Sequence, residues 1–224
     1  AIFALDTAPK PATLQAVASA DLKSGINSED YLIITVPEFS VPAETLKTWR
    51  NQTGLKTRIV TVQEIYDEFN YGLADPKAIR AFLQTAAQTW RMAPKYVLLG
   101  GEGTYDYRNH QGYNENRVPP LMISTPQGLF ASDTPLADFN NDGVTEMAIG
   151  RLPARTAAEL QIMVNRIIAY ENTAPTGWEK RVLFAADNRV GDDFTALSRQ
   201  LEGLFPAYYE RQQVYLSETS LSVA

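Results

Sequence analysis

The sequence contains no cysteine, and histidine occurs only once, at position 110. Without cysteine the chain has no disulfide, no thiolate metal site and no cysteine nucleophile of its own. A single histidine cannot form a paired-imidazole metal site. His110 lies in a polar stretch rich in Asn and Gly, where we expect its imidazole to be solvated. These absences exclude several kinds of active site from the chain itself.

The sequence also lacks a basic face and a long apolar run. Its 20 Lys and Arg and its 26 Asp and Glu give a net charge of −6, and the two signs are interspersed. No nucleic-acid partner is therefore predicted. No apolar run approaches the roughly 20 residues that cross a bilayer, so no membrane span is predicted. Residues 1–6 carry neither an initiator Met nor the start of a signal peptide, and we expect a piece of a longer precursor.

What the sequence does contain is enough apolar material for a core, at 45% hydrophobic and 10% aromatic residues among 224. Residues 1–29 are rich in small and polar residues, with Pro9, Pro11 and Gly25, and are predicted to be an irregular arm or the remnant of a preceding domain. Residues 30–224 show neither an internal repeat nor a second break in composition. They are predicted to form one α/β domain.

Short β-branched, apolar runs alternate with helical patterns after residue 30. Strands are predicted over 31–36, 57–60, 95–100, 145–150, 181–186 and 210–216. Helices are predicted after Pro42, at the capping-box pairs Thr61/Glu64 and Thr156/Glu159, after Asp75-Pro76, and around 194–204. This alternation predicts a three-layer α/β fold, an open and mainly parallel sheet with helices on both faces.

Residues 101–145 are rich in Gly, Pro and Asn and are predicted to be a long functional loop. Within them, oxygen-bearing side chains alternate and lead into a glycine, as in the first half of a calcium loop. The candidate calcium ligands are Asp138, Asn140, Asp142, the backbone carbonyl of Val144, and Glu146.

The calcium prediction has an alternative. The twelfth position of the loop is Ile149 rather than the Glu of an EF-hand, and Asp133 is a candidate to complete the shell. Because Asn, Asp and Gly dominate ordinary turns, the same residues also describe an Asx-rich turn before a strand. Both interpretations stay open.

The remaining motifs do not have the spacing of a dinucleotide site or of a catalytic site. The run GGEGTYD over 100–106 comes at the end of a predicted strand. A dinucleotide site needs glycine at the sixth position of its motif and a helix directly after it, whereas here the sixth position is Asp106 and a loop continues, so a dinucleotide site is not predicted. Glu102 and Asp106 are interpreted as loop carboxylates, and Asp192-Asp193 as acidic residues at a helix N-terminus. No catalytic residue is assigned.

Several segments, taken in order and spacing, resemble gingipain-type cysteine peptidases. They are DYLIIT at 30–35, EIYDEF at 64–69, DPKAIR at 75–80, PKYVLL at 94–99, and the run over 132–156. The resemblance extends from about residue 30 to 215 and is most specific over 138–155 and 167–171. The sequence differs from the family pattern at Glu102, where Asp is expected, and at Asn140-Asn141, where Asp-Gly is expected.

The resemblance implies a secreted or surface-exposed bacterial peptidase with a caspase-like fold built from two similar α/β halves, each of Rossmann-like topology. In that family a His–Cys dyad in the second half attacks the peptide bond. No position here matches either motif. The resemblance therefore implies that this chain is the N-terminal, non-catalytic half, partnered by the catalytic half of the same polypeptide and meeting protein substrates through the full domain. The alternative is a catalytically inactive binding or scaffold module of a large surface protein.

Overall fold

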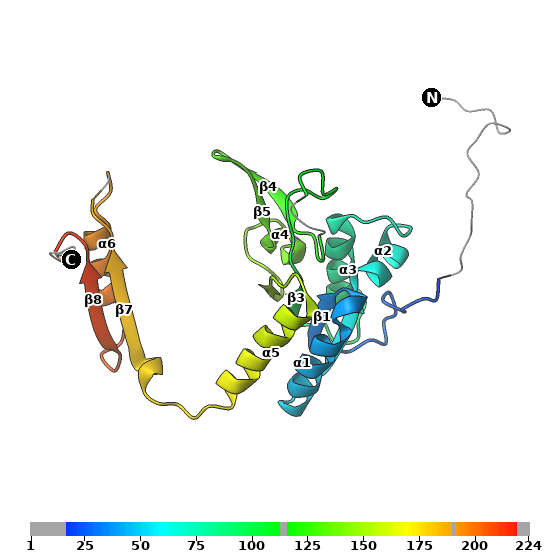
Figure 1. The fold of residues 1–224 in the computed structure, drawn as a ribbon, viewed down its shortest axis with the longest axis horizontal. Helices are drawn as coiled ribbons and strands as arrows, with labels where there is room; N and C mark the ends of the chain where they lie inside the picture. Colours follow the sequence, from blue (N-terminus) through cyan, green and yellow to red (C-terminus); the bar gives the residue numbers. More distant parts are fainter. Residues whose placement is uncertain (1–16, 113–115, 190, 219–224) are drawn as a thin grey trace. The chain divides into compact units, whose positions relative to one another are not determined.

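The computed structural model of the protein describes residues 17–112, 116–189 and 191–218 (Figure 1). The chain divides into two compact units, Ala1–Tyr170 and Glu171–Ala224, and each is described by itself. The predicted arm over residues 1–29 lies partly outside the described residues, and its boundary at residue 30 stays a prediction. In the described part of the chain, no helix combines the length and apolar character needed to cross a bilayer.

A four-stranded parallel sheet forms the centre of the first unit, in the order β2-β1-β3-β6. The strands are β1 (Tyr31–Thr35), β2 (Thr57–Thr61), β3 (Tyr96–Gly100) and β6 (Ala148–Leu152). In β1 the register places Ile34 between Val60 and Leu99, and all three side chains are buried. The two most apolar runs in the sequence thus form β1 and β3, the central strands, which are covered on both sides.

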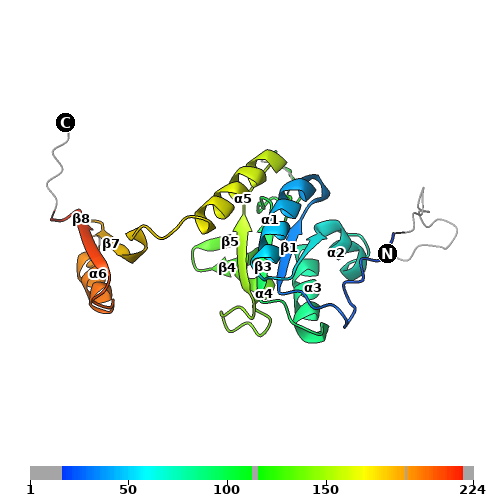
Figure 2. The ribbon, with the colours of Figure 1, turned by 90° about the horizontal axis from the view of Figure 1, so that it is seen from below.

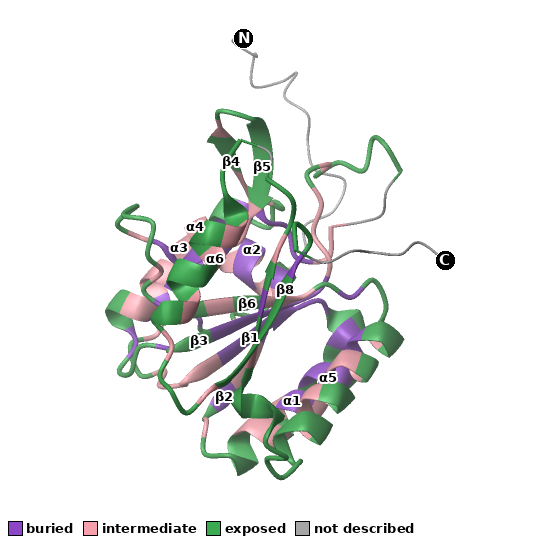
Figure 3. Ribbon diagram, turned by 90° about the vertical axis from the view of Figure 1, so that its left-hand side faces the viewer, coloured by how far each residue is buried: buried purple, intermediate pink, exposed green. Residues whose placement is uncertain are grey.

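Helices cover both faces of this sheet, as Figures 2 and 3 show. On one face lie α1 (Ser40–Gln52) and α5 (Ala157–Glu171), and on the other lie α2 (Val62–Phe69), α3 (Pro76–Thr89) and the short α4 (Thr134–Ala137). A one-turn 3-10 helix, Pro37–Phe39, precedes α1. Because parallel crossovers are right-handed, connections that run in opposite directions along the sheet place their helices on opposite faces. The predicted three-layer α/β class is confirmed.

The helix starts follow from their first residues. At α2 the amide N–H of Glu64 donates to the Thr61 hydroxyl at 3.2 Å, while the Glu64 carboxylate accepts from the Thr61 amide at 2.6 Å. This is the predicted capping box. At α3, Asp75 Oδ1 accepts from the amide of Lys77 at 2.8 Å and Pro76 takes the first helical position.

The core of the first unit also holds the segment that precedes β1. Phe82 is fully buried and makes edge-to-face contacts with Phe69 and Trp90, at centroid distances of 5.7 and 5.9 Å. The indole Nε1 of Trp90 donates to the carbonyl of Leu22 at 2.8 Å, and the Leu22 side chain is fully buried. The segment therefore has no regular structure but is anchored to the core by Leu22, whose neighbours Asp21 and Lys23 are exposed.

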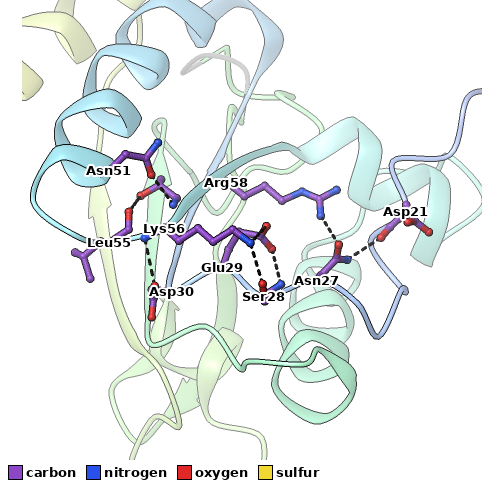
Figure 4. A network of polar contacts seen from close by, with 10 residues as sticks. Asp21, Asn27, Ser28, Glu29, Asp30, Asn51, Leu55, Lys56 and Arg58 are labelled. Carbon is purple, nitrogen blue, oxygen red and sulfur yellow. Dashed lines mark hydrogen bonds and ion pairs between the residues drawn. The ribbon is translucent and has the colours of Figure 1, made fainter.

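Polar contacts fix the same segment to β2, as Figure 4 shows. Arg58 donates to the side chain of Asn27 at 3.0 Å and to the carbonyl of Ala20 at 2.5 Å. The ammonium of Lys56 donates to the Ser28 hydroxyl at 2.8 Å. The entry into β1 is held in this way by both apolar and polar contacts.

Two boundaries within residues 101–150 differ from the prediction. The predicted loop contains an antiparallel hairpin, β4 (Leu121–Thr125) and β5 (Gly128–Ser132), and the helix α4. The last strand of the sheet covers 148–152 rather than 145–150. Glu146 instead closes the preceding loop, where its amide donates to the carbonyl of Ala137 at 2.9 Å.

The second unit is a single β-α-β element. It comprises a short 3-10 helix (Trp178–Lys180), β7 (Arg181–Ala186), α6 (Phe194–Gly203) and β8 (Glu210–Tyr215), and its two strands are parallel. The predicted strands over 181–186 and 210–216 and the helix between them are confirmed.

Candidate functional site

The candidate calcium loop, residues 138–146, winds around the carboxylate of Asp138. This side chain is only 7% exposed, and each of its oxygens accepts a backbone hydrogen bond. Asp138 Oδ1 accepts from the amide of Asn141 at 2.7 Å, and Oδ2 accepts from the amide of Gly143 at 3.0 Å. Asn141 and Gly143 have positive φ values of 61° and 88°, which let the backbone turn tightly enough to present these amides.

The alternating side chains along the loop also bond to one another. The Asp142 amide donates to Asn140 Oδ1 at 2.9 Å, and Asn140 Nδ2 donates to Asp142 Oδ2 at 3.1 Å. The Val144 amide donates to Asp142 Oδ1 at 2.8 Å. At the end of the loop, Glu146 Oε2 accepts from the Phe139 amide at 2.6 Å. The structure thus gathers all five sequence-predicted residues into one compact loop.

Arg80 of α3 connects the loop to the core. Its guanidinium donates to Asn141 Oδ1 at 2.9 Å and to the Phe139 carbonyl at 3.3 Å. No local sequence pattern predicts this contact, because Arg80 lies 61 positions from Asn141. The only indication of a role for Arg80 in the sequence is that it lies in the family-like segment over 75–80.

The donors in this loop fit calcium in kind, because all are carboxylate, amide or carbonyl oxygens. A carboxylate offers about four lone-pair positions, and the backbone uses two on Asp138. Five protein donors fall short of six to eight ligands, so water would have to complete the shell. In the part of the chain that the structure describes, no three acidic or histidine side chains cluster as a metal site. The same hydrogen bonds also satisfy an Asx-rich turn, so the geometry fits both interpretations.

Asp133, the residue considered for completing the shell, is occupied elsewhere. Both of its oxygens accept from the guanidinium of Arg151, at 2.6 and 2.8 Å. The remaining Arg151 nitrogen, Nη1, donates to the carbonyls of Gly101 and Val118 at 2.6 and 2.7 Å. Arg151 therefore joins the end of β3, the β3–β4 connection and the residue before α4, and it pairs with both oxygens of Asp133.

Glu102 and Asp106 also have structural partners, as the loop-carboxylate interpretation expects. Glu102 accepts a two-pronged contact from Arg155, at 2.7 and 3.2 Å. Asp106 Oδ2 accepts from the amide of Gln111 at 2.6 Å, and this bond lowers the pKa of the Asp106 carboxyl below its ordinary value. His110 is exposed in the same connection.

Comparison with known proteins identifies the family. The sequence pattern of peptidase family C25 matches residues 26–224, almost the whole chain. The chain belongs to peptidase family C25. The resemblance to gingipain-type cysteine peptidases is therefore confirmed. No curated protein matches the chain.

Solved structures with the same fold include other C25 proteins. The Arg-specific cysteine proteinase gingipain R (RgpB) is 20% identical, with a TM-score of 0.62 over 86% of this chain and 41% of that one. The complex of the pro- and mature domains of RgpB from Porphyromonas gingivalis is 20% identical, with a TM-score of 0.57 over 83% of this chain and 41% of that one. Dimeric latent PorU from the same organism is 22% identical, with a TM-score of 0.53 over 79% of this chain and 21% of that one. At these identities the likeness shows the caspase-like α/β fold, and the C25 chain spans less than half the length of these structures.

Proposed function

We propose that this C25 chain is the N-terminal, non-catalytic part of a gingipain-type cysteine endopeptidase domain, and that it supports a catalytic half in the same polypeptide. The observation that carries the proposal is the combination of family membership with the absence of any cysteine and of any histidine but His110. A cysteine peptidase needs a thiolate and a base within reach of it. Both groups must then come from chain outside these 224 residues.

The second unit supports this proposal. A single β-α-β element with two strands is too small to be stable without further strands or helices. Its helix α6 has no buried residue, and Leu204 just behind it is 79% exposed. Additional strands and helices of a catalytic half would cover this apolar surface.

The test is a comparison of this chain with a longer parent chain that contains both a His and a Cys. We expect the matured parent to hydrolyse fluorescently labelled casein, and iodoacetamide to abolish that hydrolysis. The 224-residue chain should be inactive. A folded, matured parent without activity would contradict the proposal and favour the scaffold alternative, and activity of the short chain would contradict its non-catalytic role.

We further propose that residues 138–146 bind a structural calcium ion through Asp138, Asn140, Asp142, the Val144 carbonyl and Glu146. The support is the gathering of these oxygen donors in one tightly wound loop. A bound cation would offset the repulsion between the Asp138 and Asp142 carboxylates. The loop would then hold α4 against the start of β6.

Thermal unfolding with EDTA and with millimolar calcium tests this site. A ligand present at a hundred times its dissociation constant stabilises the folded state by about 2.7 kcal/mol. This raises the Tm of a domain of this size by roughly 5–10 °C. The rise should disappear in Asp142→Ala and persist in Asp67→Ala, a control with the same charge change on α2. An unchanged Tm of the parent sequence would leave the Asx-rich turn as the correct interpretation.

Secretion, or display at the cell surface, is part of the same proposal. It rests on family membership and on the solved C25 structures from Porphyromonas gingivalis. Fractionation of the producing bacterium with an antibody against this chain tests it, and confinement to the cytoplasmic fraction would contradict it.

A further inference from the structure

A cavity of about 1080 Å³ opens at the carboxyl ends of the strands in the first unit. Its walls come from the turn after β1, the first turn of α2, the start of α3, and the β3–β4 connection. None of the residues of the candidate calcium loop lines it. The cavity is therefore separate from the site proposed above.

The position of this cavity is the one where open α/β sheets bind ligands. In the order β2-β1-β3-β6, the connection from β1 runs outward to β2, whereas the connection from β3 runs the other way to β6. The strand order therefore reverses between β1 and β3, and a crevice forms outside their carboxyl ends. Val36, Pro37 and Glu38 follow β1 and form one wall of this crevice.

A buried phenol without a hydrogen-bond partner lines the cavity. Tyr66 of α2 is only 5% exposed, and among the described residues its hydroxyl has no hydrogen bond. Burial, with a smaller contribution from the charge of Asp75, raises the pKa of Tyr66 to about 12. The phenol is therefore protonated at neutral pH and can donate to a ligand. The ring is buried, but the hydroxyl oxygen is not one of the fully buried polar atoms that lack a partner, so it is accessible from the cavity and free to donate to a bound acceptor.

The charged residues of the lining favour an anion. Within the described residues, the cations Lys77 and Arg108 make neither an ion pair nor a side-chain hydrogen bond. The two carboxylates of the lining are partly compensated. Glu38 lies 3.8 Å from the guanidinium of Arg117, and Asp75 accepts the capping bond at the start of α3. An incoming anion would meet two unpaired cations.

The lining also contains polar side chains, among them Gln63, Tyr107 and Asn116, and a set of apolar ones that suits a hydrocarbon body. The apolar set is formed by side chains without charge or hydrogen-bonding groups, namely Val36, Pro37, Val62, Pro119, Leu121 and Met122. A volume of this size matches sites for small molecules, in which an apolar wall surrounds a few polar groups.

We propose that this cavity binds a small organic carboxylate with an apolar body, either a free acid or the C-terminal carboxylate of a short peptide. The carboxylate pairs with Lys77 and Arg108, and the Tyr66 hydroxyl donates to an acceptor deeper in the cavity. An anion is proposed because two cations without partners among the described residues line the cavity. The apolar wall accounts for the choice of an acid that carries an aliphatic side chain.

Calorimetric titration of the 224-residue chain tests the proposal with two probes, N-acetyl-leucine and the tripeptide N-acetyl-Ala-Ala-Leu. Each is compared with its C-terminal amide, which has the same shape without the charge. We expect at least one acid to bind, and its amide to bind at least tenfold more weakly. Binding of the single amino acid indicates a free acid as the ligand, and binding of the tripeptide alone indicates a peptide terminus.

Variants locate the binding. Lys77→Gln combined with Arg108→Gln should weaken binding of the acid at least tenfold, and Tyr66→Phe should weaken it about fivefold. The control combines Lys47→Gln and Arg166→Gln, which changes the charge equally on α1 and α5 outside the cavity lining, and should bind as the parent does. The proposal is overturned if neither acid binds at millimolar concentration, if acid and amide bind equally, or if the cavity variants bind as the control does. Unchanged Tm values will show that the variants are folded.

Discussion

The two units of the chain differ in how completely each buries its own apolar residues. In the first unit, side chains of the sheet and of the helices on both faces are fully buried, among them Ile34, Phe82 and Leu99. In the second unit, Phe184 and Tyr215 are the only buried side chains of its described residues. Both units are built from parallel strands and right-handed crossovers, so the difference lies in the number of layers.

A parallel strand needs cover on both faces, and a helix needs a sheet under its apolar stripe. The first unit supplies four strands and helices on both faces. The second supplies two strands and one helix, so Leu183 of β7 and Val214 of β8 remain 60% and 49% exposed. The comparison indicates that only the first unit has a self-sufficient core.

Separating the units gives the largest expected effect. We expect a fragment of residues 1–173 to keep a cooperative urea transition and a structured near-UV circular dichroism spectrum. A fragment of residues 174–224 should show neither, because its two strands and one helix bury too little apolar surface to offset chain entropy. Cooperative unfolding of the isolated 174–224 fragment would break the comparison.

Truncating one apolar side chain in each unit is the next test. Phe82→Ala should lower the free energy of unfolding by about 3–5 kcal/mol, since it removes a fully buried ring and leaves a cavity. Leu201→Ala in α6 should change it by less than about 1 kcal/mol, because that side chain is 58% exposed. Urea denaturation of the 224-residue chain measures both values. A similar loss of unfolding free energy in both variants would show that α6 is packed in solution.

An arginine in each unit offers a third comparison. Arg151→Met should cost about 2–4 kcal/mol, because it leaves the half-buried Asp133 carboxylate and the carbonyls of Gly101 and Val118 without their donor. Arg199→Met should cost less than about 1 kcal/mol, since its ion pair with Glu218 is exposed to solvent. Hydrogen exchange of the Gly101 and Val118 region should accelerate only in the Arg151 variant.

Much of the first unit could be predicted from the sequence, because its signals are local. The strands around Ile34, Val60 and Leu99 are β-branched, apolar runs, and the Thr61/Glu64 capping box lies within four residues. The hairpin β4–β5 was missed although its strands, LMIST and GLFAS, are apolar runs, because the Gly, Pro and Asn content of residues 101–145 as a whole predicted a single loop. The start of β6 was placed too early because 145–147 looks like a strand in sequence but closes the loop after Ala137.

The candidate sites likewise combine features that local sequence predicts with features that it does not. The alternating oxygens of residues 138–146 are a local pattern. They lie in one hydrogen-bonded loop, and the calcium site itself stays a prediction. The roles of Arg80 and Arg151 depend on partners 18 to 61 positions away, and no short-range pattern carries that information. The cavity at Tyr66 is likewise formed by four separate segments. Long-range packing therefore set the limit of the sequence analysis.

The smallest expected effect concerns the two tyrosines with raised pKa values. Burial raises the pKa of Tyr66 to about 12, whereas a hydrogen bond that the Tyr208 hydroxyl donates to Tyr209 raises the pKa of the exposed Tyr208. When Tyr66 is exposed by unfolding, its pKa returns to about 10. Between pH 10 and 12 the unfolded chain therefore binds fewer protons than the folded chain, and stability falls as pH rises.

The loss amounts to about 1.4 kcal/mol per pH unit at most. The stabilisation is present in full below pH 10 and is gone above pH 12. We expect Tyr66→Phe to flatten the pH dependence of the urea midpoint in that range, because phenylalanine has no proton to lose. Tyr208→Phe should leave it close to that of the parent, since solvent weakens the exposed contact with Tyr209 that raises the Tyr208 pKa. Equal flattening by the two substitutions would contradict the difference in burial between the units, whereas flattening by Tyr66→Phe alone would locate the alkali-sensitive phenol in the core of the first unit.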